Sequence, residues 1–199
     1  MAPADADSRA VKKARKMKDP VQALNCLPPT EKQHLTSGST ITFETAWATA
    51  ISDADHEWIF DLFRRNMRKL YEQSEWGYDE VSKKQELTAT TARFIIARDQ
   101  KGQPLGYVHY RFDLDQGRRV VYCYELQIEP TFQGLGAGTH FIKALEEVAR
   151  KTDMLYVMAT VFKHNTKSLD FFHKHGYVTD EMYRQEEDEV DYVILSKPI

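Results

Sequence analysis

The sequence predicts a mixed α/β domain: a central, twisted and largely antiparallel sheet flanked by helices, after an N-terminal helical extension. Three closely spaced segments, at 94–98, 105–113 and 120–128, are rich in β-branched and aromatic residues and are separated by short turns containing Asp and Gly. This spacing indicates an antiparallel meander. A helical pattern and a further strand at 155–162 follow, so we also expect one strand–helix–strand unit.

Composition fits one intracellular globular domain. The 199 residues are 42% hydrophobic and 29% charged, and the net charge of −3 carries no nucleic-acid signature, so no DNA partner is expected. Cys26 and Cys123 lie in unrelated contexts, which argues against a disulfide scaffold and for a reducing compartment. The chain has neither a run of 18 apolar residues nor an apolar signal segment, so no membrane partner is expected either.

Residues 1–39 are interpreted as an arm before a domain at 40–199. Residues 1–10 are rich in Ala, Asp and Ser and are expected to be mobile. The basic run at 11–18 is either a solvated helix or a patch for nuclear targeting or for contact with the ribosome or RNA. Residues 25–40 contain two adjacent prolines and are interpreted as a connection.

The first half of the domain is predicted to contain a strand, a long helix and a short helix. Residues 40–47 alternate as a strand does, and Ser52-Asp-Ala-Asp55 is typical of a helix start, with acids in the first turn. The helix has one apolar side and basic residues near its end. We expect a loop at Tyr71–Gly77 and a short helix at Lys83–Leu87.

The second half begins where the strand at 120–128 leads through Pro130 into a glycine-rich corner and a helix with one apolar side. The elements expected after it are a strand at 155–162, a helix at 165–175 ended by Gly176, strands at 177–179 and 192–195, and an acidic segment at 181–191 between these two strands.

The glycine-rich corner has the spacing Gln133-x-x-Gly136-x-Gly138. Backbone N–H groups at such a helix start lack partners, and together with the positive end of the helix dipole they favour a phosphate. The spacing matches neither the dinucleotide-binding pattern nor the P-loop, since no lysine follows Gly138. It resembles the pyrophosphate loop of the GNAT acetyltransferases, Arg/Gln-x-x-Gly-x-Gly/Ala, which binds acetyl-CoA. A GNAT fold is therefore expected.

Four further segments resemble the NatD class of N-terminal acetyltransferases, which act on histones H4 and H2A. The similarity covers roughly residues 40–196, and these segments are more specific than the glycine motif. It implies acetylation of Ser-Gly-Arg-Gly-Lys tails, a cytoplasmic and nuclear location, a monomer, and contact with the ribosome as one possibility. The segments are Tyr71-Glu-Gln-Ser-Glu-Trp-Gly77, Tyr110-Arg-Phe-Asp113, Tyr122-Cys-Tyr-Glu125 and Thr160-Val-Phe-Lys-His-Asn165.

The resemblance also implies a set of acetyl-CoA-binding residues. In GNAT enzymes two strands splay apart beside this loop, which leaves a strand edge free to pair with the pantetheine arm. The same residues could equally be ordinary core residues, because the backbone does the binding. The expected residues are Leu126, Gln127, Ile128, Gln133, Gly134, Leu135, Gly136, Ala137, Gly138, Thr139 and Asn165.

Acetyl transfer to an α-amine requires only a weak base, because an amine with a pKa near 8 is about a tenth neutral at pH 7. Glu125 is the first candidate base and Asp113 the second, and the competing reading of each is a solvated or salt-bridged strand carboxylate. Many GNAT enzymes protonate the leaving thiolate with a tyrosine where this chain has Phe172. Tyr124 or Tyr192 could replace that phenol.

Aromatic residues with hydroxyl groups suggest a narrow pocket for a small first residue. On a regular strand, Tyr122 and Tyr124 would share one face and Cys123 and Glu125 the other, whereas a bulge would change that. Aromatic core packing is the alternative, and the acidic 186–191 segment is either a tail-binding site or a solvated loop. The expected substrate-binding residues are Tyr71, Trp76, Asp113, Leu114, Asp115, Tyr122, Tyr124, Thr160 and Tyr192.

Other chemistries are disfavoured. His173 and His175 have no partners that complete a metal-ligand set, and Cys123 has no nearby histidine that would activate it as an acyl carrier. We therefore expect direct transfer in a ternary complex, without a metal. Two alternatives stay open: an acetyltransferase of the same fold for other N-termini or for lysine, and a catalytically silent acetyl-CoA-binding module.

Overall fold

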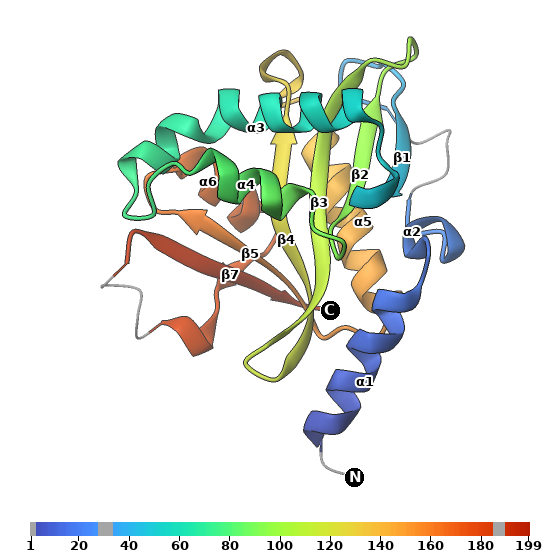
Figure 1. Ribbon diagram of the computed structural model, residues 1–199, viewed down its shortest axis with the longest axis vertical. Coiled ribbons are helices and arrows are strands. Elements are labelled where there is room, and N and C mark those ends of the chain that lie inside the picture. Colours follow the sequence, from blue (N-terminus) through green and yellow to red (C-terminus); the bar gives the residue numbers. More distant parts are fainter. Residues whose placement is uncertain (1–2, 28–33, 185–189) are drawn as a thin grey trace.

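A mixed sheet forms the centre of the molecule (Figure 1). In residues 3–27, 34–184 and 190–199, which the computed structural model describes, seven strands pair in the order β1-β2-β3-β4-β5-β7-β6. They are β1 (Thr42–Trp47), β2 (Arg93–Arg98), β3 (Pro104–Asp115), β4 (Arg118–Ile128), β5 (Tyr156–Phe162), β6 (Val178–Thr179) and β7 (Tyr192–Pro198).

The sheet confirms the predicted meander and the predicted strand–helix–strand unit. Strands β1 to β4 pair antiparallel in chain order, and β5, β7 and β6 also pair antiparallel. Of the seven described strands, β4 and β5 form the parallel pair, which extends over Val120–Cys123 and Tyr156–Ala159. Beyond Cys123 the two strands diverge, so among the described residues one edge of β4 lacks a strand partner toward its C-terminal end.

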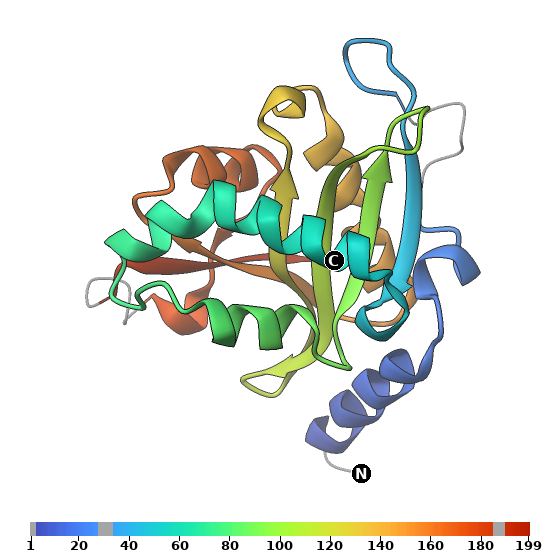
Figure 2. The same cartoon turned by 45° about the horizontal axis from the view of Figure 1, so that its top comes forward.

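Helices cover both faces of the sheet (Figure 2). Helices α3 and α4 lie on one face, where α3 packs on β2 and β3 residues such as Phe94 and Tyr107. The other face packs against α1, α2, α5 and α6 in a larger apolar cluster that includes Phe141 and Phe172. The helices are α1 (Pro3–Lys16), α2 (Pro20–Ala23), α3 (Asp53–Gln73), α4 (Glu80–Leu87), α5 (Ala137–Lys151) and α6 (Thr166–Lys174), with 3₁₀ turns η2 (Ala48–Ala50), η3 (Pro130–Phe132) and η4 (Glu181–Tyr183).

The helix boundaries follow from capping chemistry. The Ser52 side chain accepts a hydrogen bond from the N–H of Asp55 at the start of α3, and Asn165 accepts one from Ser168 at the start of α6. Helix α6 ends before Gly176, whose φ of +83° suits a residue without Cβ. Helix α3 extends three residues into the loop expected at Tyr71–Gly77, so Tyr71 lies in a helix and not in that loop.

The N-terminal segment is part of the folded structure. Residues 3–10, expected to be mobile, form the first turns of α1. Val11 and Ala14 of this helix are buried in the larger apolar cluster. The connection expected at 25–40 and the acidic segment expected at 181–191, with its 186–191 cluster, fall partly outside the described residues.

Candidate active site

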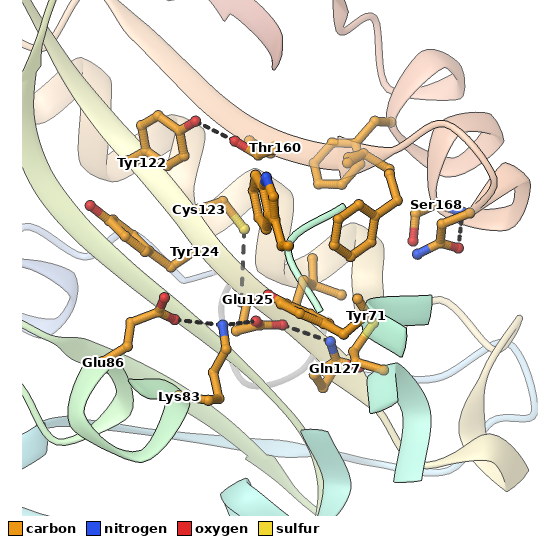
Figure 3. A pocket seen from close by; sticks show the side chains of 18 residues that line it. Tyr71, Lys83, Glu86, Tyr122, Cys123, Tyr124, Glu125, Gln127, Thr160 and Ser168 are labelled. Atoms are coloured by element: carbon orange, nitrogen blue, oxygen red, sulfur yellow. Dashed lines mark hydrogen bonds and ion pairs between the residues drawn. The ribbon is translucent and has the colours of Figure 1, made fainter. Parts of the chain in front are cut away.

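A pocket of about 380 Å³ opens where β4 and β5 diverge (Figure 3). Its floor is β4, one wall is β5 and the start of α6, and the opposite wall is the C-terminal part of α3 together with α4. Its lining residues are Met67, Tyr71, Trp76, Lys83, Glu86, Tyr122, Cys123, Tyr124, Glu125, Leu126, Gln127, Ala159, Thr160, Val161, Phe162, Asn165, Ser168 and Phe172.

A β-bulge at Tyr124 decides which side chains face this pocket. His109 of β3 pairs with Glu125 and Tyr110 pairs with Cys123, so Tyr124 is an extra residue on β4. Tyr124 stacks on His109, with 5.1 Å between the ring centroids, and Glu125 lies on the same face. A regular strand would have turned Glu125 to the α5 face beside Cys123. The bulge therefore overturns the face assignment expected for a regular strand.

Glu125 is buried at the centre of a hydrogen-bonded chain. The Lys83 Nζ atom lies 2.8 Å from Glu125 Oε1 and 2.9 Å from Glu86 Oε1. The Gln127 side chain donates to Glu125 Oε2 at 2.8 Å and accepts from Asn66 at 3.1 Å. Burial alone would lower the pKa of Lys83, but the two carboxylates outweigh it and raise that pKa, so the lysine is charged.

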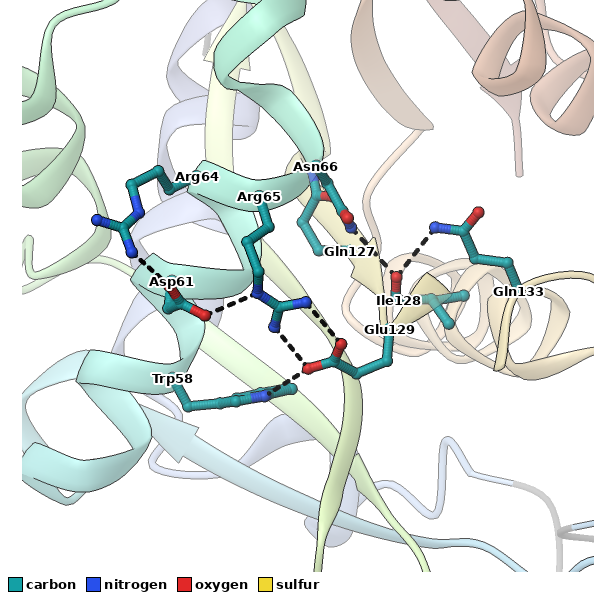
Figure 4. Close-up of polar contacts among 9 residues, drawn as sticks. All are labelled: Trp58, Asp61, Arg64, Arg65, Asn66, Gln127, Ile128, Glu129 and Gln133. Carbon is teal, nitrogen blue, oxygen red and sulfur yellow. Dashed lines mark hydrogen bonds and ion pairs between the residues drawn. The ribbon is translucent and has the colours of Figure 1, made fainter. Parts of the chain in front are cut away.

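Side chains of helix α3 hold the C-terminal end of β4 in place, next to the hydrogen bonds of Glu125 (Figure 4). Asn66 and Gln133 both donate to the carbonyl oxygen of Ile128 at 3.1 Å. Arg65 binds the Glu129 carboxylate through two hydrogen bonds of 2.8 Å, and this contact lowers the Glu129 pKa. The side chain of Gln133, a residue predicted to bind the cofactor, thus donates a hydrogen bond to the end of β4.

The tyrosines of β4 form hydrogen bonds on the far side of the pocket. The Tyr122 and Thr160 hydroxyls are 2.6 Å apart, and the Tyr124 hydroxyl donates to Asp113 at 3.1 Å. Burial raises the pKa of Tyr122, and burial together with Asp113 raises that of Tyr124 to about 12, so both phenols are neutral at pH 7. Asp113 also pairs with Arg15 of α1.

Aromatic rings surround the mouth of the pocket. Tyr71 and Trp76 each meet Phe162 edge-on, with ring centroids 5.0 and 5.2 Å apart. The ring centroids of Tyr192 and Trp76 are 4.9 Å apart, and Trp76 is 51% exposed. The predicted residues Tyr71, Trp76 and Tyr192 thus meet, and Phe162 is an additional member that the sequence interpretation missed.

Four predicted substrate residues do not line the pocket: Asp113, Leu114, Asp115 and Tyr192. Leu114 is 45% exposed and does not line it. Asp115 accepts hydrogen bonds from Arg118 at 2.8 Å and from the Tyr183 hydroxyl at 2.6 Å. Its carboxylate is therefore engaged within the protein, because Arg118 already supplies the cation that a substrate arginine was expected to supply.

The glycine corner presents free backbone donors at the start of α5. Gly134 and Gly136 have φ values of +76° and +96°, and a Cβ added at Gly134 would meet no atom within 4 Å. Within the described part of the chain, the N–H groups of Gly134 to Gly138 have no hydrogen-bond partner, as expected at a helix start. These residues fit a pyrophosphate, and Asn165 lines the adjoining pocket.

Cys123 is unsuited to act as a nucleophile. It lies in the apolar cluster on the α5 face, and burial raises the pKa of its thiol. Among the described residues, no group of His, Cys, Asp and Glu is arranged to hold a metal ion. In the same residues, no helix has the length and apolar character needed to cross a membrane.

The acetyltransferase (GNAT) family profile matches residues 55–177. The chain belongs to this family. It is thus an acetyl-CoA-dependent acetyltransferase, and the GNAT fold and use of acetyl-CoA expected from the glycine motif are confirmed. The roles of the individual site residues stay predictions.

Solved GNAT structures share the fold at low sequence identity. The GNAT domain of S. lividans PAT has a TM-score of 0.62 at 15% identity, over 83% of this chain and 94% of that one. Naa50 of Arabidopsis thaliana, solved with the bisubstrate analogue CoA-Ac-MVNAL, has a TM-score of 0.56 at 15% identity, over 80% of this chain and 99% of that one.

The same fold occurs within a longer protein. A GCN5-related glucosamine N-acetyltransferase region of a fungal multi-domain GH3 β-N-acetylglucosaminidase has a TM-score of 0.57 at 17% identity. The match covers 72% of this chain, which spans 17% of the length of that protein. At these identities all three likenesses show the fold alone.

Proposed function

We propose that this GNAT enzyme transfers acetyl from acetyl-CoA to the N-terminal α-amine of histone H4 and H2A chains after Met removal. One observation carries the proposal: three of the four segments that resemble the NatD class line one pocket, and the remaining segment reaches it through a hydrogen bond to Tyr124. Tyr71 and Trp76 come from the first segment, and Thr160 comes from the last. Glu125 belongs to the third, and Asp113 of the second bonds Tyr124.

Glu125 is proposed as the general base. It lies in the pocket at the point where β4 loses its strand partner, beside the edge that is free to bind the pantetheine arm. Acetyl-CoA, when bound, supplies the thioester carbonyl that the amine attacks. Glu125 accepts the amine proton directly or through one water, which suffices for an α-amine with a pKa near 8.

The neutral phenols are proposed to assist the transfer. Phe172 lines the pocket where many GNAT enzymes have a phenol, so protonation of the leaving sulfur needs another donor. Tyr124 faces the same pocket and keeps its proton at pH 7 because its pKa is raised to about 12. We therefore assign this proton to Tyr124, whose hydroxyl turns from Asp113 to the leaving sulfur, gives it the proton and regains one from water after CoA has left.

The shape and charge of the pocket support a small, uncharged first residue followed by basic residues. Tyr122 and Thr160 share a hydrogen bond that can extend to a serine hydroxyl. The rings of Trp76 and Phe162 limit the width near the mouth. Asp113 lies beside the pocket with its side chain 25% exposed, and an arginine of the tail would share its carboxylate with Arg15.

Thiol release from acetyl-CoA tests the proposal with a Ser-Gly-Arg-Gly-Lys peptide, either free or N-terminally blocked. Activity on the free peptide alone is the expected result. Activity on the blocked peptide would point to lysine as the acceptor. Silence on both would contradict the proposal and favour another N-terminus or a silent acetyl-CoA-binding module, which a calorimetric titration with acetyl-CoA would distinguish from loss of binding.

A further inference from the structure

Lys83 places a buried positive charge in the middle of the pocket. Its side chain is 8% exposed and emerges from α4, a helix capped by Asp79, whose carboxylate accepts from the N–H groups of Val81 and Ser82. The Nζ atom binds two carboxylates, those of Glu125 and Glu86. It also lies 4.7 Å from the ring centroid of Phe63, so the ammonium makes a cation–π contact with that aromatic face.

The other groups that face Glu125 are neutral or acidic. Tyr71 of α3 and Tyr107 of β3 have pKa values raised by burial, so both are neutral phenols. His109, opposite Glu125 on β3, has a pKa lowered well below its usual value by burial and by nearby cations. Glu86 of α4 has a pKa raised by burial.

The neighbours of Glu125 on β4 lack positive charge, and the charged Arg111 of β3 binds other groups. Gln127 donates an amide N–H to it, and burial raises the pKa of the Cys123 thiol. The guanidinium of Arg111 binds the His109 ring and the backbone oxygen of Glu86. In the described part of the chain, Lys83 is therefore the cation that contacts Glu125 directly.

We propose that Lys83 is a positioning residue for acetyl transfer, which keeps the buried Glu125 carboxylate ionised and directs its second oxygen toward the amine. This inference rests on the proposed function of Glu125 as the base. A buried carboxylate without a cation takes up a proton at higher pH, and a protonated carboxyl cannot accept the amine proton. Lys83 holds Oε1, while the Gln127 amide holds Oε2 at 2.8 Å and leaves that oxygen a free lone pair.

A purely structural role for Lys83 would have a different signature. The contact joins α4 to β4 across 42 positions of sequence, so its loss could simply loosen the fold. Loosening lowers activity by a similar factor at every pH. Loss of the counter-ion instead lowers activity mainly at low pH, because Glu125 is protonated there.

The test compares kcat/KM against pH for Lys83→Met, Lys83→Gln and Lys83→Arg, with the Ser-Gly-Arg-Gly-Lys peptide. We expect the acidic limb to move up by about 1–3 pH units in the Met and Gln variants and to return toward wild type in the Arg variant. Lys84→Met is the matched control, since Lys84 is exposed and pairs with Glu80 on the outside of α4. A uniform loss with an unshifted limb would overturn the proposal.

A second readout separates this proposal from the proposed function. The carboxyl carbon of Glu125, labelled with ¹³C and assigned through Glu125→Gln, is titrated by NMR in the wild type, Lys83→Met and Lys83→Gln. Its transition should lie at higher pH in the neutral variants even if the peptide is not the substrate. An unchanged transition, or failure of both variants to fold while Lys83→Arg behaves as wild type at every pH, would assign Lys83 to structure alone.

Discussion

At the scale of single residues, the Glu125 carboxylate is the most constrained group of the site. It is buried and receives one charged and one neutral donor. Glu125→Gln keeps the shape but cannot accept a proton, so we expect kcat to fall by at least about 100-fold. The affinity for acetyl-CoA should change by less than about threefold, because the backbone donors of Gly134–Gly138 are untouched. Thiol-release kinetics and calorimetry measure the two quantities.

Glu86→Gln is the matched control for that experiment. Glu86 binds the same ammonium at 2.9 Å, but its side chain is 30% exposed. A smaller loss, below about tenfold, is expected because Glu86 accepts no substrate proton. Equal losses in the two variants would contradict the assignment of Glu125 as the base and would indicate that the network as a whole matters.

The same residues show where inference from sequence ends. The segment Tyr122–Glu125 could be recognised from its letters alone, and its residues line the pocket as expected. The face of the sheet on which Glu125 lies could not be predicted, because the bulge at Tyr124 depends on how β4 pairs with β3. The contact of Lys83 with Glu125 could not be predicted either, since the two residues are 42 positions apart in the sequence. The signal available was its position four residues before buried Leu87, on the inner side of α4.

At the scale of elements, β4 lies close against β3 at Gly106. A Cβ added there would lie 2.8 Å from the backbone oxygen of Gln127 and 3.1 Å from a side-chain carbon of Ile128. Backbone atoms cannot move aside cheaply, so Gly106→Ala should destabilise the protein by about 1–3 kcal/mol. It should also weaken acetyl-CoA binding, because the displaced residues form the free edge of β4.

Chemical denaturation and calorimetric titration with acetyl-CoA measure these two effects. Gly102→Ala, in the exposed turn between β2 and β3, serves as a comparison, since its added Cβ would meet no atom within 4 Å and its cost is confined to a positive φ of +79°. Equal acetyl-CoA affinities in Gly106→Ala and wild type would show that the edge near Gln127 does not contribute to binding.

Helix and strand positions were more predictable than their ends. The alternation and turn chemistry located the meander, and Ser52 and Gly176 marked helix termini correctly. Helix α3 was predicted too short, because its last three residues, Tyr71–Gln73, resemble the polar loop that follows. They are stabilised by contacts that sequence does not reveal, such as the packing of Tyr71 against Phe63, with ring centroids 5.4 Å apart.

An ion cluster joins the second half of the sheet to the β3–β4 turn. Arg118 binds Asp180 at 3.0 Å and Asp115 at 2.8 Å, and the Asp180 side chain is 2% exposed. Burial would raise the pKa of Asp180, but its hydrogen bonds, chiefly with Arg118, outweigh that effect and lower it below 3.8. Because the folded-state pKa is depressed, the ionised carboxylate stabilises the fold above pH 4 and loses this contribution as pH falls through the lowered pKa.

Asp180→Asn should therefore destabilise the protein by about 2 kcal/mol at pH 7. The difference from wild type should shrink below about pH 4, where the wild-type carboxylate also becomes protonated. Urea denaturation at pH 7, 5 and 3.5 measures this difference. A difference that stays constant with pH would show that the charge of Asp180 does not account for the loss, since Asn can still accept the hydrogen bond from Met182 N–H.

At the scale of the whole molecule, the N-terminal helix belongs to the catalytic fold. Arg93 of β2 donates to the carbonyl oxygens of Arg15 at 2.9 Å and Met17 at 2.6 Å, which are free at the end of α1. Arg15 in turn binds Asp113, which holds Tyr124 in the pocket. A continuous path of contacts thus joins the helix that precedes the predicted domain to the proposed active site.

Arg93 is the residue on which the docking of α1 depends. Its guanidinium is buried 3.8 Å from the ring centroid of Trp47, and burial lowers its pKa. Arg93→Met keeps the apolar volume but leaves the α1 carbonyls without donors, so the unfolding free energy should fall by about 3 kcal/mol. Trypsin should also cut faster at Lys12–Lys18. Arg150→Met removes an exposed pair with Glu147 and should cost less than about 0.5 kcal/mol. If Arg93→Met resisted trypsin as wild type does, apolar packing of Val11 and Ala14 would suffice to hold the helix.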